Sequence, residues 1–152
     1  MPTRDPALLL DQQLCFAMYR ASRALIRAYG PLLEPLGLTY PQYLALLALW
    51  EEDALSVKRL GERLSLDSAT LTPLLKRLER QGLVERRRDQ VDQRIVRVCL
   101  SKKGQALRAR ARGVPNALAG RVADANDRSA LLRLSKLREE LQTLASRLER
   151  SA

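Results

Sequence analysis

The sequence predicts a mainly helical fold with one small β-hairpin, and three observations support this prediction. Apolar residues recur every three or four positions through most of the chain, which is the spacing of a buried helix face. Residues 83–100 instead show the alternation of apolar and polar residues that is typical of two short strands. Glycine and proline gather at residues 30–37 and again near Gly113, where they separate one element from the next.

Two helices are expected before the centre of the chain. The first runs from Pro6 to about Ala28 and carries one buried stripe, formed by Leu14, Met18, Ala21, Leu25 and Ala28. Residues 29–38, which are rich in glycine and proline, end this helix and form a connector to the next one. The second helix is expected from Thr39, its N-cap, to about Glu52, because proline at position 41 is tolerated in a first turn.

The central block is expected to hold two short helices and then the hairpin. Ser56 is a suitable N-cap for the first helix, and Asp67 for the second, which is expected over residues 68–80. Gly82 follows at the place of a left-handed C-cap residue. Two strands, residues 83–88 and 94–100, are joined by the sequence DQVDQ.

The last part of the chain is expected to be helical. Ser101 caps a basic helix that is weakened near Gly113 and Pro115. A terminal helix from Asp127 to Arg150 carries leucines at steps of three and four, which is the pattern of a coiled-coil seam: Leu131, Leu134, Leu137, Leu141, Leu144 and Leu148. Such a seam requires a partner helix.

The charge balance of the 152 residues favours a polyanionic partner. Lys and Arg number 27 against 17 Asp and Glu, which gives a net charge of +10. Double-stranded nucleic acid is the first expectation, and an acidic membrane surface is the second. No stretch is long and apolar enough to cross a bilayer, and the first residues do not resemble a signal peptide. We therefore expect a soluble cytoplasmic protein, and of the two polyanionic partners we expect nucleic acid and no membrane.

The scarcity of reactive side chains excludes several kinds of site. The chain has no histidine and only two cysteines, Cys15 and Cys99. Catalytic pairs of serine or cysteine with histidine are therefore excluded, as are zinc sites built on imidazole or on many thiolates. We expect no metal site, no cofactor and no enzymatic activity, and free cysteines fit a reducing compartment.

The central block meets the physical demands of a winged helix-turn-helix that binds DNA. The second helix of the pair must offer short polar groups to base edges, and cations to phosphates. Residues suited to these two tasks are Ser68, Thr70, Thr72, Lys76 and Arg77. The hairpin adds Arg86 and Arg94, which are placed to reach the flanking backbone or the minor groove. Asp92 is expected to hold the Arg94 guanidinium in one orientation.

Of the two cysteines, Cys15 is the one whose sequence neighbours point to a reactive thiol. It lies four residues before Tyr19, so the thiol and the phenol occupy adjoining turns of the expected helix. All six aromatic residues fall between positions 16 and 50, which favours a pocket there, although Phe16 and Trp50 are better explained as core. A reactive thiol is a thiolate, and without histidine its stabilisation depends on tyrosine hydroxyls and amide dipoles.

Several segments resemble the MarR family of bacterial transcriptional regulators. The hairpin and its exit, DQRIVRVCLSKKG at 92–104, match the wing signature D-x-R followed by L-[ST]-x-x-G. The segments LCFAMY, LTYPQYLALLALWE at 38–51 and LDSATLTPLLKRLE at 66–79 are similar to the organic-hydroperoxide-sensing, OhrR-type branch. Together these segments cover the chain from about Asp11 to Gly104.

The resemblance implies a homodimer that binds a palindromic operator in double-stranded DNA. In that branch the cysteine matching Cys15 senses organic hydroperoxides, and Tyr29 and Tyr40 of the partner subunit reach its sulfur, with Tyr19 nearby. No cysteine follows Cys99, so the chain resembles the one-cysteine form. The sulfenic acid would then be trapped as an adduct with a small thiol or oxidised further.

These observations predict a repressor that leaves its operator when Cys15 is oxidised. Residues 1–38 are expected to hold the dimerising and sensing helices, residues 39–100 the winged helix-turn-helix, and residues 101–152 the C-terminal dimerisation helices. The main alternative is a regulator released by a phenolic or other apolar ligand, with Cys15 irrelevant. A thiol peroxidase would show multiple turnovers with a thiol donor, and an architectural DNA protein would show no operator preference at any salt concentration.

Overall fold

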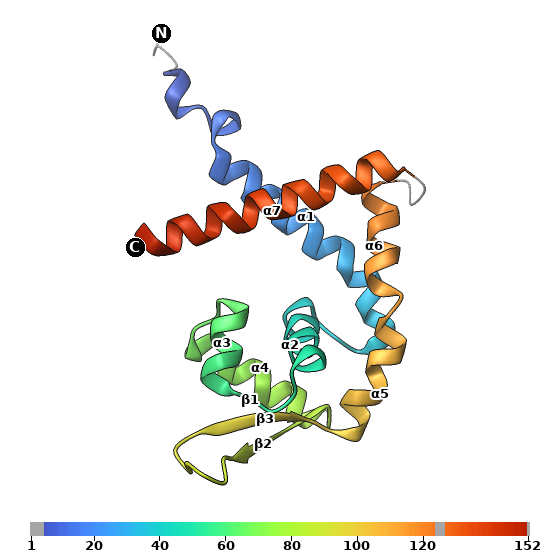
Figure 1. The fold of residues 1–152 in the computed structure, drawn as a ribbon. Helices are drawn as coiled ribbons and strands as arrows, with labels where there is room; N and C mark the ends of the chain where they lie inside the picture. Colours follow the sequence, from blue (N-terminus) through green and yellow to red (C-terminus); the bar gives the residue numbers. More distant parts are fainter. Residues whose placement is uncertain (1–4, 124–126, 152) are drawn as a thin grey trace. The chain divides into compact units, whose positions relative to one another are not determined.

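The computed structural model describes residues 5–123 and 127–151, so the ends of the expected outer segments, residues 1–4 and 152, lie outside it. The chain forms two compact units, Met1–Arg112 and Gly113–Ala152. Among the described residues, the first unit contains five α-helices, three short 3-10 turns and a small sheet, and the second contains two α-helices. Figure 1 labels these helices and strands. The prediction of a mainly helical fold with a small β-structure is confirmed. No helix in the described part of the chain is long and apolar enough to cross a membrane.

The first helix begins and ends later than the sequence predicts. Residues 6–12 form two separate 3-10 turns, Pro6–Leu8 and Leu10–Gln12, and helix α1 spans Leu14–Leu33. The expected start at Pro6 is therefore wrong. The expected helix end at about Ala28 is also wrong, because the last turn of α1 is held in the core by Leu33, which is 1% exposed. A single 3-10 turn, Glu34–Leu36, and Gly37 with a φ of 69° complete the connector.

The apolar stripe predicted to be buried on α1 is open to solvent within this chain. Leu33 is the only fully buried residue of the helix. Leu14 is 63% exposed, Met18, Ala21 and Leu25 are exposed as well, and Ala28 is half-buried. The 3.6-residue period correctly indicated an apolar helix face, but period alone does not say which surface covers it.

Helices α2, α3 and α4 follow the sequence predictions closely. Helix α2 spans Tyr40–Glu51, α3 spans Val57–Leu64 and α4 spans Ser68–Arg80. The Ser56 side chain accepts the Arg59 N–H at 3.1 Å, and Asp67 accepts the Thr70 N–H at 2.8 Å, so both predicted N-caps are confirmed. Gly61 keeps the turn tight, because a Cβ there would lie 3.0 Å from the Leu66 carbonyl oxygen.

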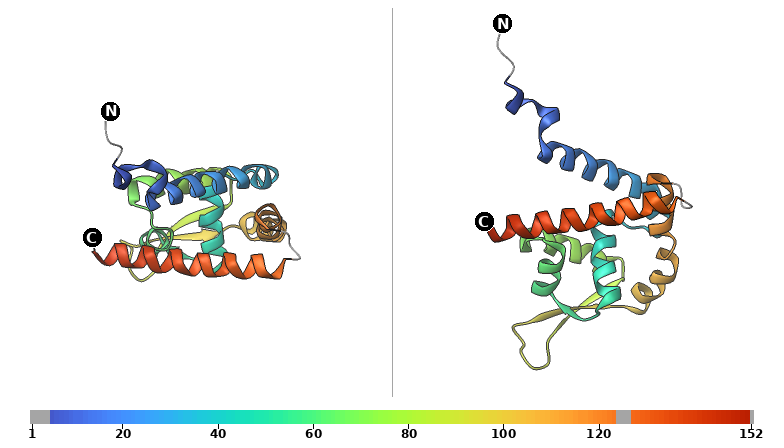
Figure 2. Two further views of the ribbon diagram at one scale, coloured as in Figure 1. Left: turned by 90° about the horizontal axis from the view of Figure 1, so that it is seen from above. Right: turned by 45° about the horizontal axis from the view of Figure 1, so that its top comes forward.

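The sheet has three antiparallel strands instead of the two predicted. Strand β2, Val84–Arg88, and strand β3, Val96–Leu100, form the expected hairpin. A two-residue strand, β1 at Leu55–Ser56, pairs with the other edge of β3. Two residues are too few to show an alternation of polar and apolar side chains, which is why β1 had no sequence signal. Figure 1 and the right-hand view of Figure 2 show the hairpin extending beyond the helices of this unit.

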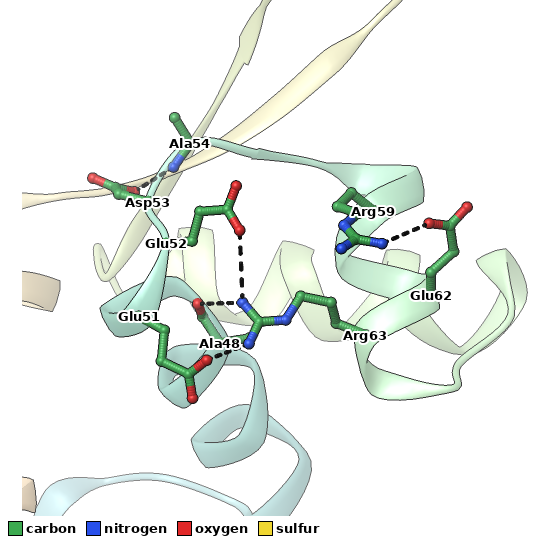
Figure 3. A network of polar contacts seen from close by, with 8 residues as sticks. All are labelled: Ala48, Glu51, Glu52, Asp53, Ala54, Arg59, Glu62 and Arg63. Atoms are coloured by element: carbon green, nitrogen blue, oxygen red, sulfur yellow. Dashed lines mark hydrogen bonds and ion pairs between the residues drawn. The ribbon is translucent and has the colours of Figure 1, made fainter. Parts of the chain in front are cut away.

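Polar contacts fix the loop that leads from α2 into β1 (Figure 3). The Arg63 guanidinium contacts the carboxylates of Glu51 and Glu52 and donates to the Ala48 carbonyl at 3.3 Å. Asp53 accepts the Ala54 N–H at 2.7 Å and the Leu100 N–H at 2.8 Å. The loop is therefore tied to α3 on one side and to strand β3 on the other.

Helix α5, Lys102–Ala111, packs against the turn between α4 and β2 through a very close backbone contact. A Cβ on Gly104 would lie 2.1 Å from the Leu83 carbonyl oxygen. The buried indole of Trp50 donates to the Gly104 carbonyl at 3.0 Å. Ser101, the predicted cap of α5, accepts the Gly104 N–H at 3.0 Å and donates to the Gly82 carbonyl at 2.6 Å. The glycine and serine of the wing signature thus hold the start of α5 against the turn between α4 and β2.

The second unit consists of α6, Val114–Val122, and α7, Arg128–Ser151. The predicted helix break near Gly113 and Pro115 is confirmed, and Asp127 accepts the Ala130 N–H at 3.0 Å at the start of α7. The predicted seam lies along α7, and four of its leucines are exposed: Leu131, Leu137, Leu141 and Leu148.

Candidate nucleic-acid interface and thiol site

The outer face of α4 presents the polar and basic residues that the sequence singled out. Its inner face is buried through Leu71, Leu74, Leu75 and Leu78. The opposite face is exposed along its length and carries Ser68, Thr70, Thr72, Lys76 and Arg77. Neither Lys76 nor Arg77 has a carboxylate within 4 Å among the described residues. Both charges are therefore available to an anionic partner.

Arg94 stands at the tip of the hairpin in the orientation that the sequence predicts. Its Nε atom donates to Asp92 Oδ1 and its Nη2 atom donates to Asp92 Oδ2, both at 3.1 Å. The backbone N–H of Arg94 also donates to Asp92 Oδ1 at 3.0 Å. The Arg94 side chain is nevertheless 91% exposed. The predicted pairing is confirmed, and it holds a charged group in a defined direction toward solvent.

A second carboxylate, Asp89, shapes the turn itself and was not predicted. It accepts the N–H groups of Val91 at 2.8 Å and Asp92 at 3.0 Å, and it pairs with the Arg97 guanidinium. These hydrogen bonds lower the pKa of Asp89 from 3.8 to about 2, the Asp92 N–H having the largest effect. An Asp that accepts hydrogen bonds two and three residues ahead is a recognisable turn signal in the stretch DQVDQ.

The depressed pKa of Asp89 predicts how the turn responds to acid. A carboxylate whose folded pKa is depressed stabilises the fold above its unfolded pKa, and this contribution is lost as the pH falls through the folded value. We expect the Val91 and Asp92 amide resonances to titrate with a midpoint at about pH 2. The Asp89→Asn protein should lack the transition, and a midpoint near 3.8 in the wild type would contradict the assignment.

Arg86 is placed differently from the expectation of a free DNA-contacting cation. Its guanidinium donates to the Glu79 carboxylate at 2.7 and 3.1 Å. The sequence did not indicate this partner, because residues seven apart on a helix and a strand show no common spacing. The proximity arises from the tight turn at Gly82, whose φ is 70°.

Cys15 lies in the first turn of α1, not in the middle of a helix as predicted, and it is exposed. Gln13, the N-cap, turns its side chain back to the carbonyls of Ala7 and Leu9, at 2.8 and 3.0 Å, and does not cap α1. The first N–H groups of an uncapped helix are free to stabilise negative charge. The amide dipoles expected to assist the thiol are therefore those of a helix N-terminus.

Tyr19 lies one turn after Cys15 and is engaged by a residue that the sequence did not indicate. Arg23 donates to the Tyr19 hydroxyl at 2.6 Å, and its guanidinium lies 5.4 Å from the centre of the ring. Tyr19 itself is exposed. The phenol and the thiol thus share one open face of α1.

Tyr29 and Tyr40 are packed together at the other end of α1, with Tyr43 as a third member of the cluster. The centre of the Tyr29 ring lies 4.8 Å from the centre of the Tyr40 ring and 5.7 Å from the centre of the Tyr43 ring. Burial raises the pKa of all three hydroxyls, so they remain protonated donors at neutral pH. Tyr29 lies 14 residues beyond Cys15, which is about 21 Å along a helix. One chain therefore does not bring these tyrosines to its own thiol.

Comparisons with known proteins agree with this architecture. Residues 38–96 match the model of the MarR family. The transcriptional regulator TtmR of Methylorubrum extorquens is 50% identical over 148 residues, covering 96% of this chain and 76% of TtmR. The organic hydroperoxide resistance transcriptional regulator of Bacillus subtilis is 48% identical over 120 residues, covering 79% of this chain and 82% of that protein.

Solved structures extend the match to three dimensions. AbfR of Staphylococcus epidermidis superposes with a TM-score of 0.74 at 37% identity, over 91% of this chain and 92% of AbfR. Reduced AbfR bound to DNA superposes with a TM-score of 0.69 at 36% identity, over 90% of this chain and 94% of that one. The matches to TtmR and to the Bacillus subtilis regulator cover most of this chain, and the fold contains the winged helix-turn-helix described above. The chain therefore belongs to the MarR family of transcriptional regulators.

Proposed function

We propose that this regulator is a homodimeric repressor that releases a palindromic operator when organic hydroperoxides oxidise Cys15. The observation that carries this proposal is the position of Cys15, exposed in the uncapped first turn of α1. The sulfur is not buried in the core of its own chain, and free amides at the start of the helix favour the negative charge that a nucleophilic thiolate carries. The similarity to the Bacillus subtilis organic hydroperoxide resistance regulator supports the same chemistry.

The proposed reaction begins with attack of the Cys15 thiolate on the outer oxygen of the hydroperoxide. The O–O bond breaks, the sulfur is oxidised to a sulfenic acid, and the peroxide is reduced to an alcohol after protonation. A small cellular thiol then condenses with the sulfenic acid, which forms a mixed disulfide and releases water. Cys99, half-buried on β3, takes no part in this sequence.

A second subunit would complete the sensor. The exposed stripe of α1 and the exposed seam of α7 are apolar faces that a second copy would cover. An antiparallel arrangement of the two α1 helices would bring Tyr29 and Tyr40 of the partner subunit to Cys15 and Tyr19, because these tyrosines lie at the opposite end of α1 from the thiol. Their protonated hydroxyls would donate to the thiolate.

We propose that the mixed disulfide is the form that leaves the operator. An overoxidised form of AbfR has been solved bound to DNA, and a separate structure describes AbfR with a disulfide. A bulky adduct between tyrosine side chains requires movement of the surrounding helices, whereas added oxygen atoms need less room. Such movement would change the distance between the two α4 helices of the dimer, which must match the operator.

Substitution of each cysteine separates this proposal from release by a ligand. Wild-type and Cys99→Ser proteins should leave operator DNA after treatment with cumene hydroperoxide and a small thiol, with the thiol adduct on Cys15 detected by mass spectrometry. Cys15→Ser should bind the operator with unchanged affinity and remain bound under the same treatment. Release of the Cys15→Ser protein would contradict the proposal and favour a regulator controlled by an apolar ligand.

A further inference from the structure

Strand β2 carries a charged residue where its neighbour is buried. Val84 and Arg86 lie on the same side of the strand, since side chains alternate between the two faces. Val84 is 1% exposed, whereas the Arg86 side chain is 32% exposed and turned toward α4. An apolar residue would pack better at this position facing α4, so a charged Arg86 there indicates a role other than packing.

Arg86 and Glu79 form a three-point contact between the wing, which is the hairpin of β2 and β3, and α4, the helix expected to read the DNA and here called the recognition helix. The Arg86 Nη2 and Nε atoms donate to Glu79 Oε2 at 2.7 and 3.1 Å. The Arg86 backbone N–H donates to Glu79 Oε1 at 3.3 Å. These hydrogen bonds lower the pKa of Glu79, which is therefore ionised at neutral pH. Both the side chain and the backbone of the strand are thus held by one carboxylate in the last turns of α4.

This contact is better suited to fixing an orientation than to stabilising the fold. Ion pairs that remain partly exposed contribute little to stability, and apolar replacements of buried pairs are often as stable. A forked contact between guanidinium and carboxylate, however, is satisfied in only one relative geometry. The pair therefore restricts the angle between β2 and α4.

The wing also needs such a restraint at its base. Its tip is held internally by Asp89 and by the pairing of Asp92 with Arg94. Strand β3 is held from one side by β1, but β2 is the outer strand of the sheet. Within the described residues, Glu79 and Arg86 form the only ion pair that joins β2 to a helix.

We propose that Glu79 and Arg86 are positioning residues that set the wing at the angle to α4 needed for both to contact DNA together. Arg86 acts through Glu79 and does not itself neutralise a phosphate. The inference rests on the DNA-binding function proposed above and adds to it the origin of the wing geometry.

Substitution of Glu79 gives opposite results for a positioning pair and for a DNA-contacting Arg86. Removal of a carboxylate near DNA, by electrostatics alone, strengthens binding and frees the arginine. A positioning role predicts that Glu79→Gln weakens operator binding about tenfold. Arg86→Gln and Arg86→Lys should weaken it to a similar degree, because lysine keeps the charge but loses the fork. The double variant Glu79→Gln, Arg86→Gln should be no weaker than either single variant, because the two residues act as one unit.

The salt dependence of binding supplies a readout that a loss of stability would not change. A phosphate contact made by Arg86 itself would reduce the slope of log K against log salt by about one in Arg86→Gln but not in Glu79→Gln, whereas a positioning pair predicts equal slopes for these two variants. Glu85→Gln is the matched control, because Glu85 lies on the same strand but pairs with Arg87 two residues away. It should bind at least as tightly as the wild type.

An apolar pair tests the proposal without disturbing the packing. Glu79→Leu with Arg86→Met should melt close to the wild type and still lose about tenfold in affinity. Tighter binding by Glu79→Gln, wild-type affinity of Arg86→Lys, or wild-type affinity of the apolar pair would each overturn the inference. A wild-type protein that shows no operator preference under reducing conditions would instead contradict the proposed function.

Discussion

Gly104→Ala is expected to destabilise the regulator by about 3 kcal/mol, the upper part of the range for overpacked sites. The new Cβ would lie 2.1 Å from the Leu83 carbonyl oxygen and 3.1 Å from its carbon, so backbone atoms must move. The same movement would disturb the Trp50 indole hydrogen bond to the Gly104 carbonyl and the Ser101 N–H bond to Leu83. Because these contacts join α2, α5 and the base of the wing, a small shift is not absorbed locally.

Thermal unfolding at fixed protein concentration measures this effect. A loss of 3 kcal/mol corresponds to a decrease in melting temperature of roughly 6–12 °C for a chain of this size. Gly120→Ala is the control, since its new Cβ meets no described atom within 4 Å and alanine favours the α6 helix. Equal melting temperatures for Gly104→Ala and the wild type would show that the close approach to Leu83 is not structurally required.

Arg94→Ala is expected to weaken operator binding about tenfold to hundredfold, the range for loss of a directed arginine contact. The side chain is 91% exposed, yet Asp92 holds its guanidinium with two hydrogen bonds, so little conformational freedom is lost on binding. Asp92→Asn keeps the cation but removes the charged partner that orients it. We expect a smaller loss of affinity for that variant than for Arg94→Ala.

Titration of labelled operator with reduced protein at several salt concentrations checks both variants. A phosphate contact by Arg94 reduces the salt slope by about one, whereas a minor-groove contact lowers affinity with preference for particular base pairs. Arg150→Ala, which removes the same charge from the last turn of α7, should bind like the wild type. Equal affinities of Arg94→Ala and Arg150→Ala would contradict a DNA-contacting wing tip.

Local sequence signals predicted most helices and the hairpin, because their causes are local. The caps Ser56, Asp67 and Ser101 satisfy N–H groups within three residues, so their spacing was visible in the chain. The pairing of Asp92 with Arg94 was visible for the same reason. Strand β1 and the Glu79–Arg86 contact left no such pattern, since each depends on a partner brought near by the fold.

The N-terminal region shows where local signals were overridden. Apolar periodicity predicted a helix from Pro6, but residues 6–12 form separate 3-10 turns and α1 starts at Leu14. At the other end, Gly30 and Pro31 remain helical because burial of Leu33 outweighs their low helix propensity. The shift of the helix start moves Cys15 from the helix interior to the first turn, which is the position on which the proposed sensing function depends.

The sequence by itself determined the class of protein and the position of the DNA-recognition helix, and it singled out Cys15 as the thiol on which the proposed sensing function rests. Helical and strand periods, capping residues and charge are properties of neighbouring residues, so they can be read without coordinates. Only the tertiary structure decided that Arg86 is paired with Glu79 and that Cys15 lies at a helix N-terminus. It also decided that Tyr29 and Tyr40 pack far along α1 from Cys15. These features depend on distances between residues remote in sequence, which packing of the core sets and local pattern does not.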